Sequence, residues 1–234
     1  MDALCVFGRG IEKVRVCGEY AWRPTRLIEV LSENRFHTGY RAVGLDPEDE
    51  FSVIAGANAN VLAAIQIFEE LAKNNNPPRL VMFAAGRPKY LALDPDPTLS
   101  EGKILAEKFI RMVNIENTNF PEIITQSENK NSKDDLEQSL ELATKNEVTN
   151  LSIITVSVHI PRVKELFRMC LNDKPLYKNL GISFLASEKI LLRRYKSISL
   201  YKRMLSQLQG SKAYQRTVLN EQQGIIALRS GNYG

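Results

Sequence analysis

A serine, a histidine and an arginine lie together near residue 160, where an apolar run gives way to a helical pattern. The apolar run, residues 151–156, is short and rich in β-branched side chains, which is typical of a strand covered on both faces. Apolar residues then repeat at helical spacing, at Val163, Leu166, Phe167 and Cys170. The turn between the two segments holds Ser157, His159, Pro161 and Arg162.

This turn has the features of an anion-binding site. A strand that runs into a helix leaves its turn at the carboxyl edge of the sheet, where open α/β sheets bind ligands. The first N–H groups of the helix favour an anion, and the Arg162 guanidinium adds a fork of donors. His159 can act as a general base or bind a ligand, although a lone histidine is more often a hydrogen-bonded structural residue. Ser157 is a nucleophile only in principle, because nothing in the sequence activates it.

Two glycine-containing turns follow other predicted strands. Gly8-Arg9-Gly10 follows the apolar run 3–7, and Gly86-Arg87 follows the run 79–84. Glycine lets the backbone approach a ligand closely. The first turn is shorter than the dinucleotide-binding fingerprint, so a simple tight turn explains it at least as well.

Two acidic helix starts extend the candidate site. Thr98 and Glu101 have capping-box spacing, with Glu101 at the third helical position. Helix capping by Glu101 is favoured by roughly two to one over the alternative, in which Glu101 and Ser100 face the cleft at the sheet edge. In the second start, Asp135 is expected to be the capping acid. Asp134 is then free to face the cleft or, more commonly, the solvent.

Strands and helices alternate along the chain. Further helices are expected at 24–31, from Asn58 or Asn60 to about 73, at 99–113 and from 133 to about 146, and further strands at 51–55, 123–124 and 181–186. This alternation predicts an α/β fold with three layers, in which helices cover both faces of a parallel sheet joined by right-handed crossovers. We expect a single domain over residues 1–234, with 188–234 as a mainly helical, basic C-terminal extension.

Composition narrows the functional classes. The chain of 234 residues has 25% charged residues and a net charge of +4, so nucleic acid is not the default partner. No apolar run reaches the ~20 residues that span a bilayer, and the first residues do not resemble a signal peptide, so a cytoplasmic protein is expected. The three cysteines form no CxxC pair, which argues against disulfides and a zinc cluster. No metal site is predicted, and a hard cation held by carboxylates remains open.

The segment 188–203 interleaves basic and apolar residues. A basic amphipathic helix can bind an anionic membrane or nucleic acid. More often it is an outer helix whose lysine and arginine stems cover apolar surface, and we favour this interpretation.

The order of these motifs resembles the YdcF/SanA/ElyC-like family, whose members are α/β domains of largely unknown function. The likeness covers roughly residues 3–190 and depends most on the helix start 99–102, the loop 126–135 and the turn 155–162. The family's polar positions correspond here to Glu101, Asn131, His159 and Arg162. The chain departs from the family pattern at Gly102, Gln126, Asn129, Ser132, Asp134, Asp135 and Val156. Gly102 replaces an alanine, and Gln126 replaces a glutamate.

The resemblance implies a Rossmann-like sheet with a polar cleft. One relative is associated with S-adenosylmethionine binding and others, which carry membrane anchors, with envelope biogenesis; this chain fits the soluble branch. The leading hypothesis is a protein that binds an anionic or nucleotide-like small molecule, with S-adenosylmethionine as a candidate cofactor. The expected ligand-binding residues are Gly8, Arg9, Gly10, Gly86, Arg87, Ser100, Asn131 and Ser157, beside Glu101, His159 and Arg162.

Two alternatives belong to other functional classes. The first is a hydrolase or transferase acting on a phosphorylated or envelope-precursor substrate, with His159 as acid/base and Arg162 as anion clamp, and with Glu101 either orienting His159 or binding a metal. The second is an interaction module that binds membrane or RNA through the basic tail. The sequence leaves the oligomeric state open.

Overall fold

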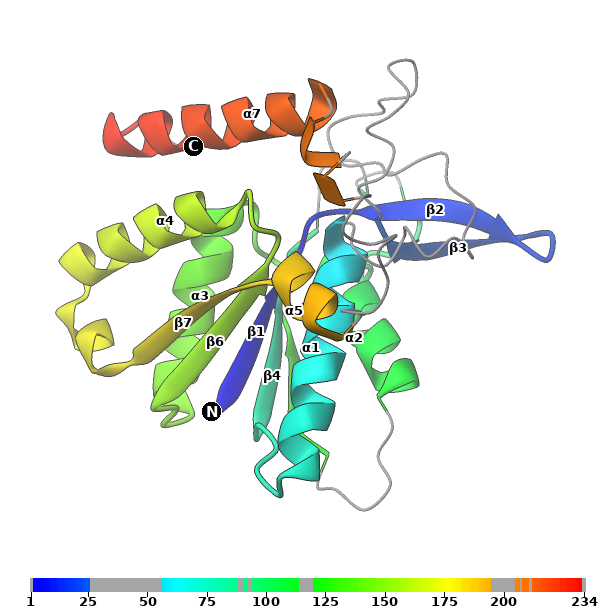
Figure 1. Ribbon diagram of the computed structural model, residues 1–234, viewed down its shortest axis with the longest axis horizontal. Helices are drawn as coiled ribbons and strands as arrows, with labels where there is room; N and C mark the ends of the chain where they lie inside the picture. Colours follow the sequence, from blue (N-terminus) through cyan, green and yellow to red (C-terminus); the bar gives the residue numbers. More distant parts are fainter. Residues whose placement is uncertain are drawn as a thin grey trace.

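Five parallel strands form a sheet in the order β5-β4-β1-β6-β7 (Figure 1). The computed structural model describes residues 2–25, 56–87, 91, 94–113, 120–194, 205–206, 208–210 and 212–232. The strands are β1 (Ala3–Phe7), β4 (Leu80–Ala84), β5 (Glu122–Thr125), β6 (Asn150–Thr155) and β7 (Gly181–Ala186). The expected parallel α/β sheet is confirmed.

Helices cover both faces of the sheet, which confirms the three layers (Figure 1). Because side chains alternate along a strand, Leu4 and Val6 of β1 join the core on one face, and Cys5 and Phe7 join the core on the other. The first face packs against α1 (Gly56–Lys73), α2 (Glu101–Met112) and α5 (Ser187–Arg194). The second packs against α3 (Ser132–Lys145), α4 (Ile160–Asp173) and the short 3-10 helix η4 (Pro175–Asn179).

The strand order reverses between β1 and β6. From β1 the chain moves outward through β4 to β5, then crosses back to β6 on the other side of β1 and continues to β7. Open α/β sheets bind ligands at such a reversal, outside the carboxyl ends of the strands. The turns that follow β1 and β6 therefore meet at the favoured position for a site.

An antiparallel hairpin that was not predicted from the sequence follows β1. It consists of β2 (Ile11–Val16) and β3 (Glu19–Pro24). Its turn residues Cys17 and Gly18 have φ of 49° and 91°, as a two-residue hairpin turn requires. The helix expected at 24–31 is wrong at its start, because Pro24 ends β3; the remainder, and the strand expected at 51–55, lie outside the described residues.

Helix starts differ from expectation more than helix ends. Helix α1 begins at Gly56 rather than at Asn58 or Asn60, because those asparagines lie inside it; Asn60 Nδ2 donates to the Phe7 carbonyl at 2.8 Å. The other expected helices and strands from residue 99 to residue 186 are present within a few residues of their expected limits.

The described part of the C-terminal extension contains two helices with bounds in the structure. Helix α5 buries Ile190 and Leu191 against α1 and exposes Lys189 and Arg193, as the outer-helix interpretation expects. Helix α7 (Lys212–Arg229) lies beyond the carboxyl ends of the strands, alongside α4 (Figure 1). In the described part of the chain, no helix combines the length and hydropathy that crossing a membrane requires.

Candidate functional site

A cavity of about 120 Å³ lies at the carboxyl edge of the sheet, where the turns after β1 and β4 meet the starts of α3 and α4. Most of the residues that the sequence analysis singled out line it: Gly8, Arg9, Gly10, Gly86, Glu101, Asn131, His159 and Arg162. Residues not assigned to the site from the sequence also line it: Ala85, Asn129, Lys130, Ser132 and Asp135. Arg87, Ser100 and Ser157 are not among the lining residues.

The glycines of these turns allow segments of the protein itself to pack closely. A Cβ atom at Gly8 would overlap Ala85 and the carboxyl group of Glu101, and one at Gly86 would overlap the backbone of Asn129. A Cβ at Gly102 would lie 2.8 Å from the Ala85 carbonyl oxygen. The turns after β1 and β4 and the start of α2 are therefore in direct contact, which gives the cavity a rigid floor.

The cationic wall of the cavity, which we define as Arg9, His159 and Arg162, holds a carboxylate from α7. Glu221 Oε1 lies 2.8 Å from Arg9 Nη1, and Glu221 Oε2 lies 2.9 Å from His159 Nδ1 and 3.2 Å from Arg162 Nε. Glu221 is only 6% exposed, and His159 is 1% exposed. One buried carboxylate thus neutralises two guanidinium groups and contacts the imidazole ring.

The protonation states of this cluster follow from its contacts. Burial alone would raise the pKa of Glu221, but the hydrogen bond with His159 and the charges of Arg9 and Arg162 lower that pKa to about 2. Burial lowers the pKa of His159 to about 4, so its ring is neutral at pH 7. An ionised Glu221 can only accept, hence His159 Nδ1 carries the proton and donates it to the bond. Arg9 Nη1 also lies 3.3 Å from His159 Nδ1, but both nitrogens then carry hydrogen, so this contact is not a hydrogen bond.

Glu101 and Asp135 line the cavity with carboxyl groups of altered acidity. Burial raises the pKa of Glu101 to about 7. Hydrogen bonds that the backbone N–H groups of Gly10 and Arg9 donate to its carboxyl group lower the pKa, but by less. Burial also raises the pKa of Asp135 well above its usual value, and the nearby Glu101 adds to this. Asp135 accepts from Asn129 Nδ2 at 2.9 Å. The cavity therefore contains two carboxyl groups that hold their protons at a higher pH than usual, and Glu101 bonds the same turn that carries Arg9.

Both capping interpretations of these acids are wrong. Ser100, not Thr98, is the N-cap of α2, because the backbone N–H and hydroxyl of Thr98 donate to Asp96. Glu101 is then the first residue of the helix, and its carboxyl group reaches the turn after β1 instead of the helix start. The hypothesis that Glu101 orients His159 is also not met, since the carboxylate bonded to His159 is Glu221.

The start of α3 exchanges the expected roles of its two aspartates. Asn131 is the N-cap, and its side-chain oxygen accepts from the backbone N–H groups of Lys133 and Asp134. Asp134 accepts from the Lys130 backbone N–H at 3.0 Å and so supports the helix start, whereas Asp135 faces the cavity. Asn131 therefore lines the cavity as expected, but its side-chain oxygen accepts hydrogen bonds from the start of α3.

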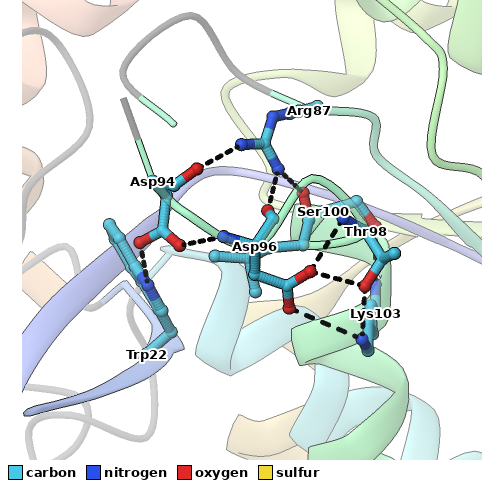
Figure 2. A network of polar contacts seen from close by, with 8 residues as sticks. Trp22, Arg87, Asp94, Asp96, Thr98, Ser100 and Lys103 are labelled. Atoms are coloured by element: carbon cyan, nitrogen blue, oxygen red, sulfur yellow. Dashed lines mark hydrogen bonds and ion pairs between the residues drawn. The ribbon is translucent and has the colours of Figure 1, made fainter. Parts of the chain in front are cut away.

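Arg87 organises the loop before α2 rather than lining the cavity (Figure 2). Its Nη1 donates to the carbonyl oxygens of Asp96 and Leu99, and its Nη2 donates to those of Leu91 and Asp94. Asp94 and Asp96 use their side chains within the same loop and toward Trp22. Both terminal nitrogens of the Arg87 guanidinium are thus hydrogen-bonded to backbone carbonyl groups of this loop.

Ser157 is likewise engaged away from the cavity. Its backbone N–H and its hydroxyl both donate to Glu188 Oε2, at 2.9 and 3.0 Å. Glu188 is 2% exposed and lies in the first turn of α5, so this contact fixes the turn after β6 against the helix that follows β7. The hydroxyl is therefore held on the α5 side of the turn by the Glu188 carboxylate, and Ser157 is not among the residues that line the cavity.

Sequence reasoning missed Glu221 because nothing local distinguishes it. It is an acidic residue within a helix of low amphipathicity, 212 positions after Arg9. Only its contacts in space identify it. Among the described residues, no group of three or more histidine, cysteine or acidic side chains is arranged to hold a metal ion.

No protein-family model, curated protein or solved structure matches the chain. The resemblance to the YdcF/SanA/ElyC-like family thus depends on the short motifs described above. What the structure shares with that expectation is the five-stranded parallel α/β sheet and its flanking helices.

Proposed function

We propose that the chain binds a small molecule through an anionic group at the carboxyl edge of its sheet, as a member of the YdcF/SanA/ElyC-like family. The observation that carries this proposal is the cationic wall. The side chains of Arg9 and Arg162 are 9% and 16% exposed, and buried guanidinium groups are stable only beside an anion. A phosphate or carboxylate group is the ligand chemistry that such a pair binds best.

A buried donor supports the same proposal. Arg162 Nε makes no hydrogen bond within the described part of the chain, although Glu221 Oε2 lies 3.2 Å away. Unpaired buried donors cost roughly 1–3 kcal/mol, so an oxyanion placed to accept from Arg162 Nε would gain that energy. The ion pair with Glu221 thus leaves the hydrogen-bonding capacity of Arg162 Nε unused, and an oxyanion with better geometry would accept from it.

The size of the cavity limits what it can enclose. About 120 Å³ accommodates a group the size of a phosphate, whereas whole drug-sized or nucleotide-like ligands occupy pockets of roughly 300–1,000 Å³. A nucleotide or S-adenosylmethionine would place its anionic part in the cavity and extend beyond it, or would require the cavity to widen.

Calorimetric titration with pyrophosphate, ATP and S-adenosylmethionine tests the proposal. Arg162→Gln should weaken binding of the preferred ligand by about tenfold or more, because it removes a charge-assisted contact worth about 1.4 kcal/mol or more. Arg168→Gln is the matched control, since Arg168 lies on the same helix and its side chain is 59% exposed. Affinity that is unchanged in both Arg9→Gln and Arg162→Gln would contradict the proposal.

A second candidate function is phosphoryl or acyl-group hydrolysis or transfer. The observation in its favour is Glu101, a buried cavity residue whose pKa of about 7 suits an acid/base group at neutral pH. Arg9 and Arg162 would clamp the substrate anion, and His159 would contact the substrate rather than act as the base, because its pKa is about 4. Screening phosphomonoesters for turnover tests this. Glu101→Gln should reduce the rate by roughly 10²–10⁴-fold, and a rate that Glu101→Gln does not change would exclude it.

A further inference from the structure

One face of α7 is directed at the site. Glu221, Gly224 and Leu228 are spaced by three and four residues, so they lie on the same side of the helix. Glu221 enters the cationic wall, and Leu228, which is 2% exposed, joins the core of the α3 and α4 face. A Cβ atom at Gly224 would lie 2.9 Å from Arg162 Nη1. The helix thus packs directly onto the arginine of the candidate site.

The rest of α7 is attached weakly. Leu219 and Ile226 are 56% and 65% exposed, and Leu228 is the single fully buried apolar residue among the α7 side chains that the structure describes. Arg229 pairs with Glu165 at 3.1 Å, but the arginine side chain is 65% exposed and such a pair contributes little. The Glu221 ion cluster is therefore the most buried charged contact between the described part of α7 and the rest of the domain.

We propose that Glu221 occupies the position of the ligand's anionic group, so that α7 is a displaceable cap over the binding site. This inference rests on the proposed function. Carboxylate and phosphate oxygens accept from guanidinium groups in the same way, and two buried arginines need one such partner at all times. An incoming oxyanion can therefore replace Glu221 without leaving a charge unpaired.

The cap also accounts for the small cavity. The cavity of about 120 Å³ is lined by all three residues of the cationic wall but not by Glu221, and it is well below the size of a pocket for a whole organic ligand. Displacing α7 would free the atoms of Arg9, His159 and Arg162 that Glu221 contacts, so that the binding site would extend from the cavity onto the whole cationic wall. The ligand class that fits is one with a phosphate or carboxylate group joined to a larger body.

If α7 and the ligand compete for the cationic wall, a substitution that weakens the contact of α7 should increase the affinity for the ligand. A ligand that binds only the open form has its affinity reduced by the fraction of molecules that are open. Glu221→Gln removes the charge of the internal occupant and keeps its size, so the open fraction increases and anions bind more tightly. Gly224→Ala acts in the same direction without a change of charge, because its methyl group pushes against Arg162.

Hydrogen exchange of α7 amides in the full chain, with and without pyrophosphate, tests the inference. We expect saturating pyrophosphate to accelerate exchange in α7 of the wild-type protein. We also expect Glu221→Gln and Gly224→Ala to bind pyrophosphate about tenfold more tightly or better. Glu141→Gln is the control: it removes an equal charge from the exposed pair with Lys174, which involves neither α7 nor the cavity, so its affinity should match the wild type.

The outcomes separate the two proposals. Pyrophosphate that binds while α7 exchange stays unchanged, or that binds Glu221→Gln no better than the wild type, overturns the cap and leaves the anion site standing. Binding by neither the wild type nor Glu221→Gln removes the anion site and the cap together. The wild-type exchange measurement needs no variant, so it decides the matter even if a substitution prevents folding.

Discussion

His159 Nδ1 lies 2.9 Å from Glu221 Oε2, although 62 positions separate the two residues in the chain. The bond joins the turn after β6 to α7 and sets the tautomer of the imidazole ring. The Glu221 carboxylate therefore both attaches α7 to the rest of the domain and sets the charge of the candidate site.

Removing that carboxylate should destabilise the protein. In Glu221→Ala, Arg9 and Arg162 lose their shared counter-charge, and we expect a loss of about 3 kcal/mol, as for other broken buried ion pairs. Urea denaturation measures this. Glu141→Ala is the control, because Glu141 and Lys174 form an exposed pair, and it should cost about 1 kcal/mol or less. Equal losses in the two variants would contradict the buried ion cluster.

The pH dependence of stability should report His159. The unfolded chain takes up a proton near pH 6.5, whereas the folded protein does so only near pH 4. Stability is therefore lost as the pH falls from 6.5 to 4, by up to about 3 kcal/mol. The His159→Asn variant should lack this loss. Its free energy of unfolding relative to that of the wild type should therefore increase as the pH falls from 6.5 to 4. A constant difference between pH 6.5 and pH 4 would show that the ring is not held neutral.

Glu101 should act in the opposite direction. Its folded pKa of about 7 exceeds the usual 4.5, so the protein loses stability as the pH rises from 4.5 to 7. Glu101→Gln keeps an acceptor for the Gly10 N–H but cannot ionise. Relative to the wild type it should gain about 2–3 kcal/mol between pH 4.5 and pH 8. Thermal melts of both proteins at the two pH values test this, and a difference that does not grow with pH would refute it.

A methyl group at position 102 should be poorly tolerated. The resembled family has alanine there, but a Cβ in this chain would lie 2.8 Å from the Ala85 carbonyl oxygen and 2.9 Å from that of Phe83. We expect Gly102→Ala to cost roughly 1–3 kcal/mol through overpacking, despite the better helix propensity of alanine. Gly210→Ala is the control, since nothing lies within 4 Å of its Cβ position. Calorimetric melting temperatures of the two variants should therefore move apart.

Arg87 should affect the loop before α2 and leave ligand binding unchanged. Arg87→Ala removes donors from four backbone carbonyl groups, and we expect a loss of about 2 kcal/mol. Pyrophosphate affinity should remain that of the wild type, because Arg87 does not line the cavity. A tenfold weaker affinity would return Arg87 to the ligand-binding set.

The sheet was predictable because its strands are buried on both faces. The run 3–7 is continuously apolar and the run 151–156 is mostly so, and the turns after them carry glycine or polar residues, which marks the carboxyl edge. The hairpin after β1 was not predictable in this way. Its turn is Cys17-Gly18 rather than the usual asparagine-glycine, and its strands do not alternate cleanly.

The site was only partly predictable, because spacing does not identify the partner of a side chain. Glu101 fitted a capping box, yet Thr98 is bonded to Asp96, so the helix starts two residues later and Glu101 turns toward Gly10. Glu221 had no local signal at all. Its role depends on a contact across nearly the whole described chain, which periodicity and motif spacing do not record.

The contact between Arg9 and Glu221 also sets an order of events during synthesis. Arg9 leaves the ribosome early, at the end of the central strand, whereas its carboxylate partner follows 212 residues later. The strands on both sides of β1 can pair before that helix exists. We therefore expect that the sheet can form in a nascent chain while Arg9 and Arg162 still lack the Glu221 carboxylate that neutralises them.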